Sequence, residues 1–316
     1  FEDFHYITWR NSIDPDITFM ELFYAPFFSA LSVCVLFLIS RTYGYSVRTS
    51  LILVFLFSLS TTIWAYAQTS LNVVPLIFFI LTGFFFYRKF QETNSHFNLI
   101  LTAIFFGLGF LTRQDMILLI IPFFVFILIT SFRKNPKLKT FVKTFLSFVI
   151  PAVSSYVITQ IIQHVRIGTD TIQGMPMAVV VARDVAIGAT NEPLLERIFG
   201  LLFSPGAGLF IYAPILFTCF VGFFDFYKKN KSDCILMISF AVSFVLLYAS
   251  SSTWHGFNGW GARYLLPIVP FLILPLGASI EKRTNFFFKI PIILFAVVGF
   301  LINVVYLLQD VAYFVW

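Results

Sequence analysis

The sequence predicts an all-α protein that crosses a membrane many times. Of its 316 residues, 59% are hydrophobic and 11% are charged, whereas a soluble domain carries about 25% charged residues. The chain also contains 44 phenylalanines, which is more apolar surface than a water-soluble core could bury. Because lipid offers no partner to backbone polar groups, helices are the expected spanning elements.

About ten apolar runs approach membrane-spanning length, and the fourth is the shortest. They lie at residues 22–40, 49–67, 72–87, 98–112, 116–132, 141–162, 207–226, 234–251, 264–280 and 287–308. Prolines inside several runs are tolerable where neighbouring helices satisfy the freed carbonyl groups. The chain thus divides into a polar segment (1–21), six helices (22–162), a folded loop (163–206) and four helices (207–316).

The charged residues predict which helix ends face the cytoplasm. If segment 1–21 lies outside and the spans alternate, the inner connections hold 15 of the 21 basic residues, including every lysine. The outer segments then hold six arginines and 11 of the 15 acidic residues. Because an excess of Lys and Arg marks cytoplasmic loops, we expect a multi-pass protein of the cell membrane with its chemistry outside. This topology accounts for the net charge of +6, so no nucleic-acid partner is predicted.

Cysteines and histidines give no sign of a disulfide framework or a metal site. Cys34, Cys219 and Cys234 lie in or beside apolar runs, as small core residues do. The four histidines show no paired spacing, and the sequence contains no nucleotide-binding glycine loop and no GxSxG motif. No cofactor is predicted, although the sequence leaves a divalent metal ion open.

The stretch "GFLTRQDMILLIIP" places Arg113, Gln114 and Asp115 between two apolar runs. Charged groups near membrane depth are costly, so they usually face a cavity or a partner. Arg113 is therefore a candidate to bind an anion, and Asp115 is a candidate to border a polar cavity. An interfacial Arg113–Asp115 ion pair without chemistry explains the same residues.

The stretch "LLFSPGAGLFIYAP" places Ser204 and Gly206 before the seventh run. A helix that begins there would direct free backbone N–H groups toward the outer interface, which suits a phosphate. Ser204 and Gly206 are therefore candidate anion-binding residues. A simple turn and helix start is the alternative.

The stretch "STWHGFNGWGARYLLPIVPF" gathers Trp254, His255, Trp260, Arg263 and Tyr264. Arginine can hold a phosphate through two parallel hydrogen bonds. The tryptophans can anchor among lipid headgroups or stack on a sugar, and His255 can carry a proton. An aromatic belt with an interfacial arginine is the alternative, but it explains neither the glycines nor the histidine.

These motifs, in this order, resemble the GT-C membrane glycosyltransferases, and in particular the dolichyl-phosphate-mannose protein mannosyltransferase-like set. The resemblance covers residues from about 30 to 280. It is carried by "WAYAQTSLNVVPLIFFIL", "GLGFLTRQDMILLIIP", "HVRIGTDTIQG", "SPGAGLFIYAP" and "WHGFNGWGARYLLPIVPFLILPL". Two positions depart from the family pattern. Gln68 replaces an arginine, and the segment from Asn72 to Pro75 lacks the family's acidic residue, which weakens a polar site on the outer face.

The resemblance implies a transferase whose donor is a sugar on a polyprenyl or dolichyl phosphate. The acceptor is a glycan, a lipid or a protein. The family's catalytic aspartate lies in a large outer loop after the first helix, so we expect it upstream of Phe1, together with one more helix. The catalytic residue is therefore unassigned.

The resemblance also groups the candidate residues. Arg113, Arg263, Ser204 and Gly206 would bind the donor phosphate. Trp254, His255, Trp260, Tyr264 and Asp115 would border the sugar or acceptor cavity. A non-enzymatic transporter or flippase of lipid-linked glycans is the main alternative, and a structural membrane subunit is a third. The polar residues crowd on one face and no internal repeat occurs, which favours the transferase.

Overall fold

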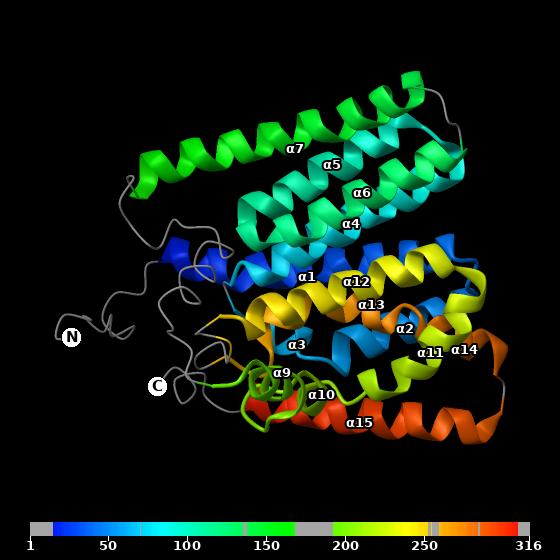
Figure 1. The fold of residues 1–316 in the computed structure, drawn as a ribbon. Coiled ribbons are helices and arrows are strands. Elements are labelled where there is room, and N and C mark those ends of the chain that lie inside the picture. The colour runs from blue at the N-terminus through cyan, green and yellow to red at the C-terminus, as the bar shows by residue number, and fades with distance from the viewer. Residues whose placement is uncertain are drawn as a thin grey trace.

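The computed structural model is a bundle of helices, and the described part of the chain contains no strand (Figure 1). The described residues are 15–69, 71–134, 138–167, 192–251, 254, 259–283 and 285–308. The longer helices are α1 (Pro15–Thr42), α2 (Val47–Leu59), α4 (Val73–Thr93), α5 (His96–Thr112), α6 (Ile117–Lys134), α7 (Leu138–Ile167), α9 (Leu194–Phe203), α11 (Leu216–Lys229), α12 (Lys231–Ala249) and α15 (Phe286–Leu308). The shorter ones are α3 (Ile63–Tyr66), η1 (Gln114–Met116), α10 (Leu209–Tyr212), η3 (Arg263–Ile268), α13 (Val269–Ile273) and α14 (Leu276–Lys282).

Each predicted apolar run is occupied by helix, and the all-α multi-pass fold is confirmed. Within the described residues, seven helical segments are long and apolar enough to cross a membrane. They are α1, α4, η1–α6, α7, α12, η3–α14 and α15. The remaining three runs give the shorter helices α2, α5 and α11, with 13, 17 and 14 residues. The expected number of about ten spans is therefore not confirmed.

Local chemistry explains why some predicted runs are broken. Run 49–67 breaks after α2, where the Thr61 hydroxyl donates to the Phe57 carbonyl at 2.6 Å. Run 207–226 breaks between α10 and α11 at Pro214, which has no N–H to continue a helix. Run 264–280 contains Pro267, Pro270 and Pro275, and it forms a 3₁₀ turn followed by two short helices.

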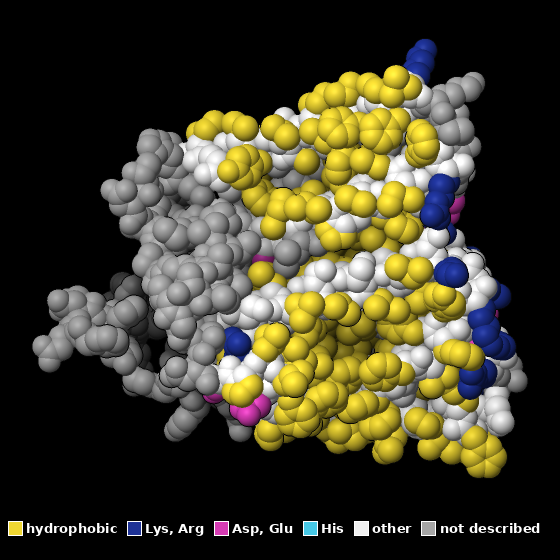
Figure 2. Space-filling view, viewed as in Figure 1, with side chains coloured by type: hydrophobic (Ala, Val, Ile, Leu, Met, Phe, Trp, Pro, Cys, Tyr) yellow, Lys and Arg dark blue, Asp and Glu magenta, His cyan; other side chains and the backbone are white. Residues whose placement is uncertain are grey.

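The long helices run back and forth across the bundle, so their connections gather at two ends (Figure 1). The turns α1–α2, α4–α5, α6–α7, α11–α12 and α14–α15 form one end, called the basic end. The turns α3–α4, α5–α6 and α9–α10 and residues 259–263 form the other, called the arginine end. Figure 2 shows Lys and Arg along the basic end, on the right, and hydrophobic side chains over the face between the ends. Among the described residues, the lysines thus gather at the basic end.

Phenylalanines pack the centre of the bundle. The Phe84 ring of α4 meets Phe123 of α6 at 5.9 Å and Phe271 of α13 at 5.1 Å, both edge to face. Phe271 in turn meets Phe240 of α12 at 5.3 Å. Edge-to-face contact is a favoured geometry for aromatic rings. These contacts tie four helices together around an apolar cluster.

Buried carboxylates at the basic end are bound to cations. Asp233 at the start of α12 accepts hydrogen bonds from Arg88 at 2.6 Å and from the Tyr43 hydroxyl at 2.9 Å. Asp225 in α11 pairs with Lys282 at 2.8 Å and with Arg283 at 3.1 Å. A buried charge is tolerable when it is paired in this way. These contacts fix α12 to α4, and α11 to the end of α14.

Candidate functional site

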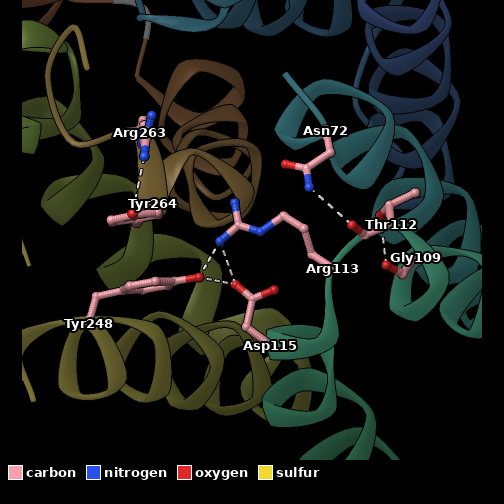
Figure 3. Close-up of polar contacts among 8 residues, drawn as sticks. All are labelled: Asn72, Gly109, Thr112, Arg113, Asp115, Tyr248, Arg263 and Tyr264. Atoms are coloured by element: carbon pink, nitrogen blue, oxygen red, sulfur yellow. Dashed lines mark hydrogen bonds and ion pairs between the residues drawn. The ribbon is translucent and has the colours of Figure 1, made fainter. Parts of the chain in front are cut away.

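A tight turn at the arginine end positions Arg113 and Asp115. Helix α5 ends at Thr112, and Arg113 follows in an extended conformation with φ −152° and ψ 125°. The side chain of Asn72 donates to the Thr112 carbonyl at 3.1 Å, which satisfies a group that the helix end leaves open. The 3₁₀ turn η1 then carries Asp115 back toward Arg113. This local geometry places both charges on one side of the turn (Figure 3).

Arg113, Asp115 and Tyr248 form a closed triangle. Nη2 of Arg113 lies 2.6 Å from Oδ2 of Asp115. The same nitrogen donates to the Tyr248 hydroxyl, which itself donates to Oδ2 of Asp115 (Figure 3). The side chains of Arg113 and Asp115 are only 12% and 2% exposed. A buried ion pair needs such extra hydrogen bonds to offset the loss of hydration.

The triangle keeps Arg113 charged and partly available. Burial alone lowers the pKa of Arg113, but the nearby Tyr248 and Asp115 outweigh burial and raise the pKa above its ordinary value. Both side-chain bonds use Nη2, and Figure 3 shows the other terminal nitrogen directed away from Asp115. Oδ2 of Asp115 accepts both of the bonds that hold this carboxylate. The geometry of Asp115 is that of a residue that positions Arg113.

Two stacked tyrosines connect Arg113 to Arg263. The rings of Tyr248 and Tyr264 lie 4.5 Å apart with an interplanar angle of 3°. Nη2 of Arg263 donates to the Tyr264 hydroxyl at 3.1 Å, and its guanidinium carbon lies 4.9 Å from the ring centre. The guanidinium carbon of Arg113 lies 5.7 Å from the same ring. The two arginines, far apart in the sequence, thus lie against one aromatic ring. We call Arg113, Asp115, Tyr248, Tyr264 and Arg263 the arginine–tyrosine cluster.

Residues 259–263 approach their neighbours closely. A Cβ on Gly259 would lie 2.9 Å from Cδ of Arg263 and 3.1 Å from the Tyr66 hydroxyl, so only glycine fits without displacing them. Tyr66 donates to the Trp260 carbonyl at 3.1 Å. The Trp260 ring meets Tyr212 of α10 edge to face at 4.9 Å. The glycines of the sequence motif therefore let Arg263 and Trp260 pack against α3 and α10.

Ser204 and Gly206 lie in a turn between α9 and α10. The hydroxyl of Ser204 accepts the Ala207 N–H at 3.1 Å, and the Gly208 N–H bonds to the Ser204 carbonyl at 2.8 Å. The N–H groups of Ala207 and Gly208 are thus engaged within the turn, and anion binding by Ser204 and Gly206 stays a prediction. The engagement is local, because Ser204 turns back on the chain and helix α10 begins only at Leu209. Gly206 is exposed at the tip of the turn.

Trp254 lies with helix α9 instead of with Trp260. Its indole N–H donates to Glu192 at 2.9 Å, and its ring covers Gly200, where a Cβ would come within 2.4 Å. The structure thus brings together Arg113, Asp115, Tyr264 and Arg263, and it places Trp254 apart. His255 lies outside the described residues.

Sequence reasoning missed Tyr248. It occupies the last turn of α12, inside the predicted run 234–251, where it looked like one more aromatic residue of a span. A usable signal was present, because Tyr248 is a hydroxyl-bearing residue at the same end of the bundle as Arg113. The stretch that lacks the family's acidic residue is buried in α4, with Val74 fully enclosed. The described residues contain no group of three His, Cys, Asp or Glu side chains that could hold a metal ion.

Comparison with known families agrees with the resemblance read from the motifs. Residues 19–158 match the sequence model of the dolichyl-phosphate-mannose-protein mannosyltransferase family. The matched region runs from α1 into α7 and contains Arg113 and Asp115. A comparison with curated proteins finds no match. With this match over residues 19–158 and its all-helical multi-pass fold, the chain is similar to the membrane glycosyltransferases of the GT-C type.

Proposed function

We propose that the protein transfers a sugar from a polyprenyl- or dolichyl-phosphate donor to an acceptor at the outer face of the cell membrane. The acceptor is a glycan, a lipid or a protein. The observation that carries this proposal is the arginine–tyrosine cluster, in which Arg113 and Arg263 lie against one tyrosine ring at the end opposite the lysine-bearing loops.

The cluster has the chemistry to bind a phosphate and to stabilise it as a leaving group. Arg263 has no carboxylate partner among the described residues, and Arg113 keeps donors that Asp115 does not use. Guanidinium groups bind phosphate oxygens through charge-assisted hydrogen bonds, which are strong where water is scarce. Ser204 and Gly206 stay proposed neighbours of the phosphate, with Gly206 exposed at its turn.

The proposed reaction is a substitution at the anomeric carbon. A hydroxyl or amine of the acceptor attacks this carbon, a carboxylate accepts the proton, and the lipid phosphate departs with the electrons of the broken C–O bond. This carboxylate is not assigned, because Asp115 is already engaged by Arg113 and Tyr248. Trp254, His255, Trp260 and Tyr264 are proposed to border the sugar or the acceptor.

The distribution of charges supports an outer site. Lysines at the basic end, such as Lys229 and Lys231, are exposed, as expected for loops retained in the cytoplasm. The alternative, a transporter or flippase, needs a polar path near the middle of the bundle. The described interior is instead packed by rings such as Phe84, Phe240 and Phe271, which favours chemistry at one end.

The test is Arg263→Ala in the full-length protein that contains this chain, reconstituted in vesicles with a radiolabelled polyprenyl-phosphate hexose. We expect transfer to be abolished while expression and membrane insertion persist. Arg133→Ala, an exposed arginine at the basic end, is the control and should transfer normally. Full activity of Arg263→Ala contradicts the assignment. Movement of the donor between leaflets without transfer, in the unaltered protein, supports the flippase instead.

A further inference from the structure

Helix α9 exposes large apolar side chains and buries a charged one. Its exposed residues are Leu194, Leu195, Glu196 and Phe199, of which Leu195 is 78% exposed. Its buried side carries Arg197, Gly200 and Leu201. A soluble amphipathic helix would turn its charge outward and its leucines inward. In a membrane protein this arrangement is expected when the charge faces the interior of the bundle.

The charge on Arg197 is uncompensated among the residues that the structure describes. Arg197 is 7% exposed, and its Nε and Nη1 are enclosed without a hydrogen-bond partner. In the part of the chain that the structure describes, Arg197 makes no ion pair. Arg113 and Arg88, which are also largely enclosed, pair with Asp115 and with Asp233. Enclosing a guanidinium without a counter-charge costs free energy. An anion that binds Arg197 would therefore stabilise the protein.

The surroundings of Arg197 lie beside the proposed site. Helix α9 packs against α10 and against α12, whose last turn carries Tyr248 (Figure 1). One turn after Arg197, the Trp254 ring covers Gly200. The outward leucines of α9 are suited to contact lipid chains. An anion that reaches Arg197 thus lies at a helix that packs against α12, which also carries Tyr248.

We propose that Arg197 is an anion-binding residue that holds the phosphate of an isoprenoid lipid. The planar guanidinium suits two phosphate oxygens at once, and the apolar face of α9 suits the attached chain. This inference rests on the proposed function, since it names a further residue for the same donor or for the lipid phosphate that leaves. Arg197 acts by binding and has no part in proton transfer.

The test measures binding and stability instead of turnover. The full-length protein in phosphatidylcholine nanodiscs is heated with farnesyl phosphate, with farnesol or with inorganic phosphate, and unfolding is followed by tryptophan fluorescence. We expect only farnesyl phosphate to raise the unfolding midpoint. An equal rise with inorganic phosphate overturns the lipid assignment, and the absence of a rise with all three overturns the site.

Removing an unpaired buried charge should raise the unfolding midpoint, whereas removing one partner of an ion pair should lower it. Arg197→Met is expected to raise the unfolding midpoint of the ligand-free protein by about 3 °C and to abolish the response to farnesyl phosphate. Arg197→Lys should keep the response with about tenfold weaker affinity, because one charge stays and the paired donors are lost. Arg113→Met should instead lower the midpoint, since it leaves Asp115 without its cation.

Two results overturn the proposal without touching the transferase assignment. If Arg197→Met lowers the ligand-free midpoint, the charge is already paired within the protein, with a carboxylate outside the described residues. If Arg197→Met responds to farnesyl phosphate as the unaltered protein does, the anion binds elsewhere. Conversely, loss of binding in Arg197→Met together with normal transfer by Arg263→Ala supports Arg197 and contradicts the role given to Arg263.

Discussion

The rings of Tyr248 and Tyr264 are stacked 4.5 Å apart and nearly parallel, and each hydroxyl bonds to a different arginine. Tyr248 comes from α12 and Tyr264 from η3, so the stack joins two helical segments at the arginine end. Arg113 is also bound to Asp115, whereas the guanidinium of Arg263 donates to the Tyr264 hydroxyl. The stack therefore separates an arginine that is anchored by a carboxylate from one that is held by a phenol.

The Arg113–Asp115 pair is expected to contribute strongly to stability. Because the pair is buried, Arg113→Met leaves Asp115 uncompensated and should lower the free energy of unfolding by about 3 kcal/mol. The double variant Arg113→Met with Asp115→Leu should regain most of that loss. Both are measured by urea unfolding in detergent. A double variant that is no more stable than the single one contradicts this account.

Tyr248→Phe tests the contribution of the Tyr248 hydroxyl apart from that of the stacked ring. The variant keeps the ring against Tyr264 and removes the bonds to Arg113 and Asp115, so it should lose about 1–3 kcal/mol of stability. Because Arg113 then loses a fixed partner, the KM for the lipid donor should rise more than kcat falls. Transfer assays over a range of donor concentrations distinguish the two parameters. An unchanged KM means that Tyr248 does not position Arg113 for the donor.

Gly259→Ala tests the close approach beside Arg263. The new methyl group would lie 2.9 Å from Cδ of Arg263, so the guanidinium must shift. We expect transfer to fall at least about tenfold, since a displacement near 1 Å can cost up to a hundredfold. Gly109→Ala is the control, because its Cβ would meet its neighbours at an ordinary 3.4 Å. Equal activities of the two variants argue against a precise placement of Arg263.

Asp233 and Glu92 provide a matched pair at the basic end. Asp233→Asn removes the charge that holds Arg88 and should lower the free energy of unfolding by about 3 kcal/mol. Glu92→Gln breaks an exposed pair with Lys89 and should change it by about 0.5 kcal/mol or less. Denaturant titrations of both variants measure the difference. A similar loss of stability in both variants shows that the contribution of Asp233 does not depend on its burial.

Sidedness is testable with single cysteines. After Cys34, Cys219 and Cys234 are changed to alanine, Glu196→Cys and Lys229→Cys each place one exposed thiol at opposite ends of the bundle. In intact cells an impermeant maleimide should label residue 196 only, and after permeabilisation both residues. Labelling of residue 229 alone in intact cells means that the arginine end faces the cytoplasm.

The sequence predicted what depends on composition and local chemistry. The helical class follows from apolar runs, and Arg113 and Arg263 stand out because charges are rare beside such runs. The sequence did not predict the partner of either arginine. Tyr248 meets Arg113 only because α12 packs against α6, and no local pattern encodes which helices become neighbours.

Breaks within the predicted runs were missed for a related reason. Hydropathy does not register where a helix stops, so run 49–67 was treated as one helix although α2 ends at Leu59. It also does not register that the Ser204 hydroxyl accepts the Ala207 N–H within its own turn. Arg197 was counted as one of six arginines on one side. Its burial depends on which way α9 faces, and that is set by packing against α10 and α12.

Helix α12 is fastened at both of its ends. Asp233 in its first turn is bound to α4 and to the α1–α2 connection, and Tyr248 in its last turn is bound to Arg113 and Asp115. The two points are about 22 Å apart along a helix of this pitch. A rotation or a sliding of α12 would break both sets of bonds at once. Any rearrangement that admits or releases a long lipid chain must therefore move other helices relative to α12, which is held in place at both ends.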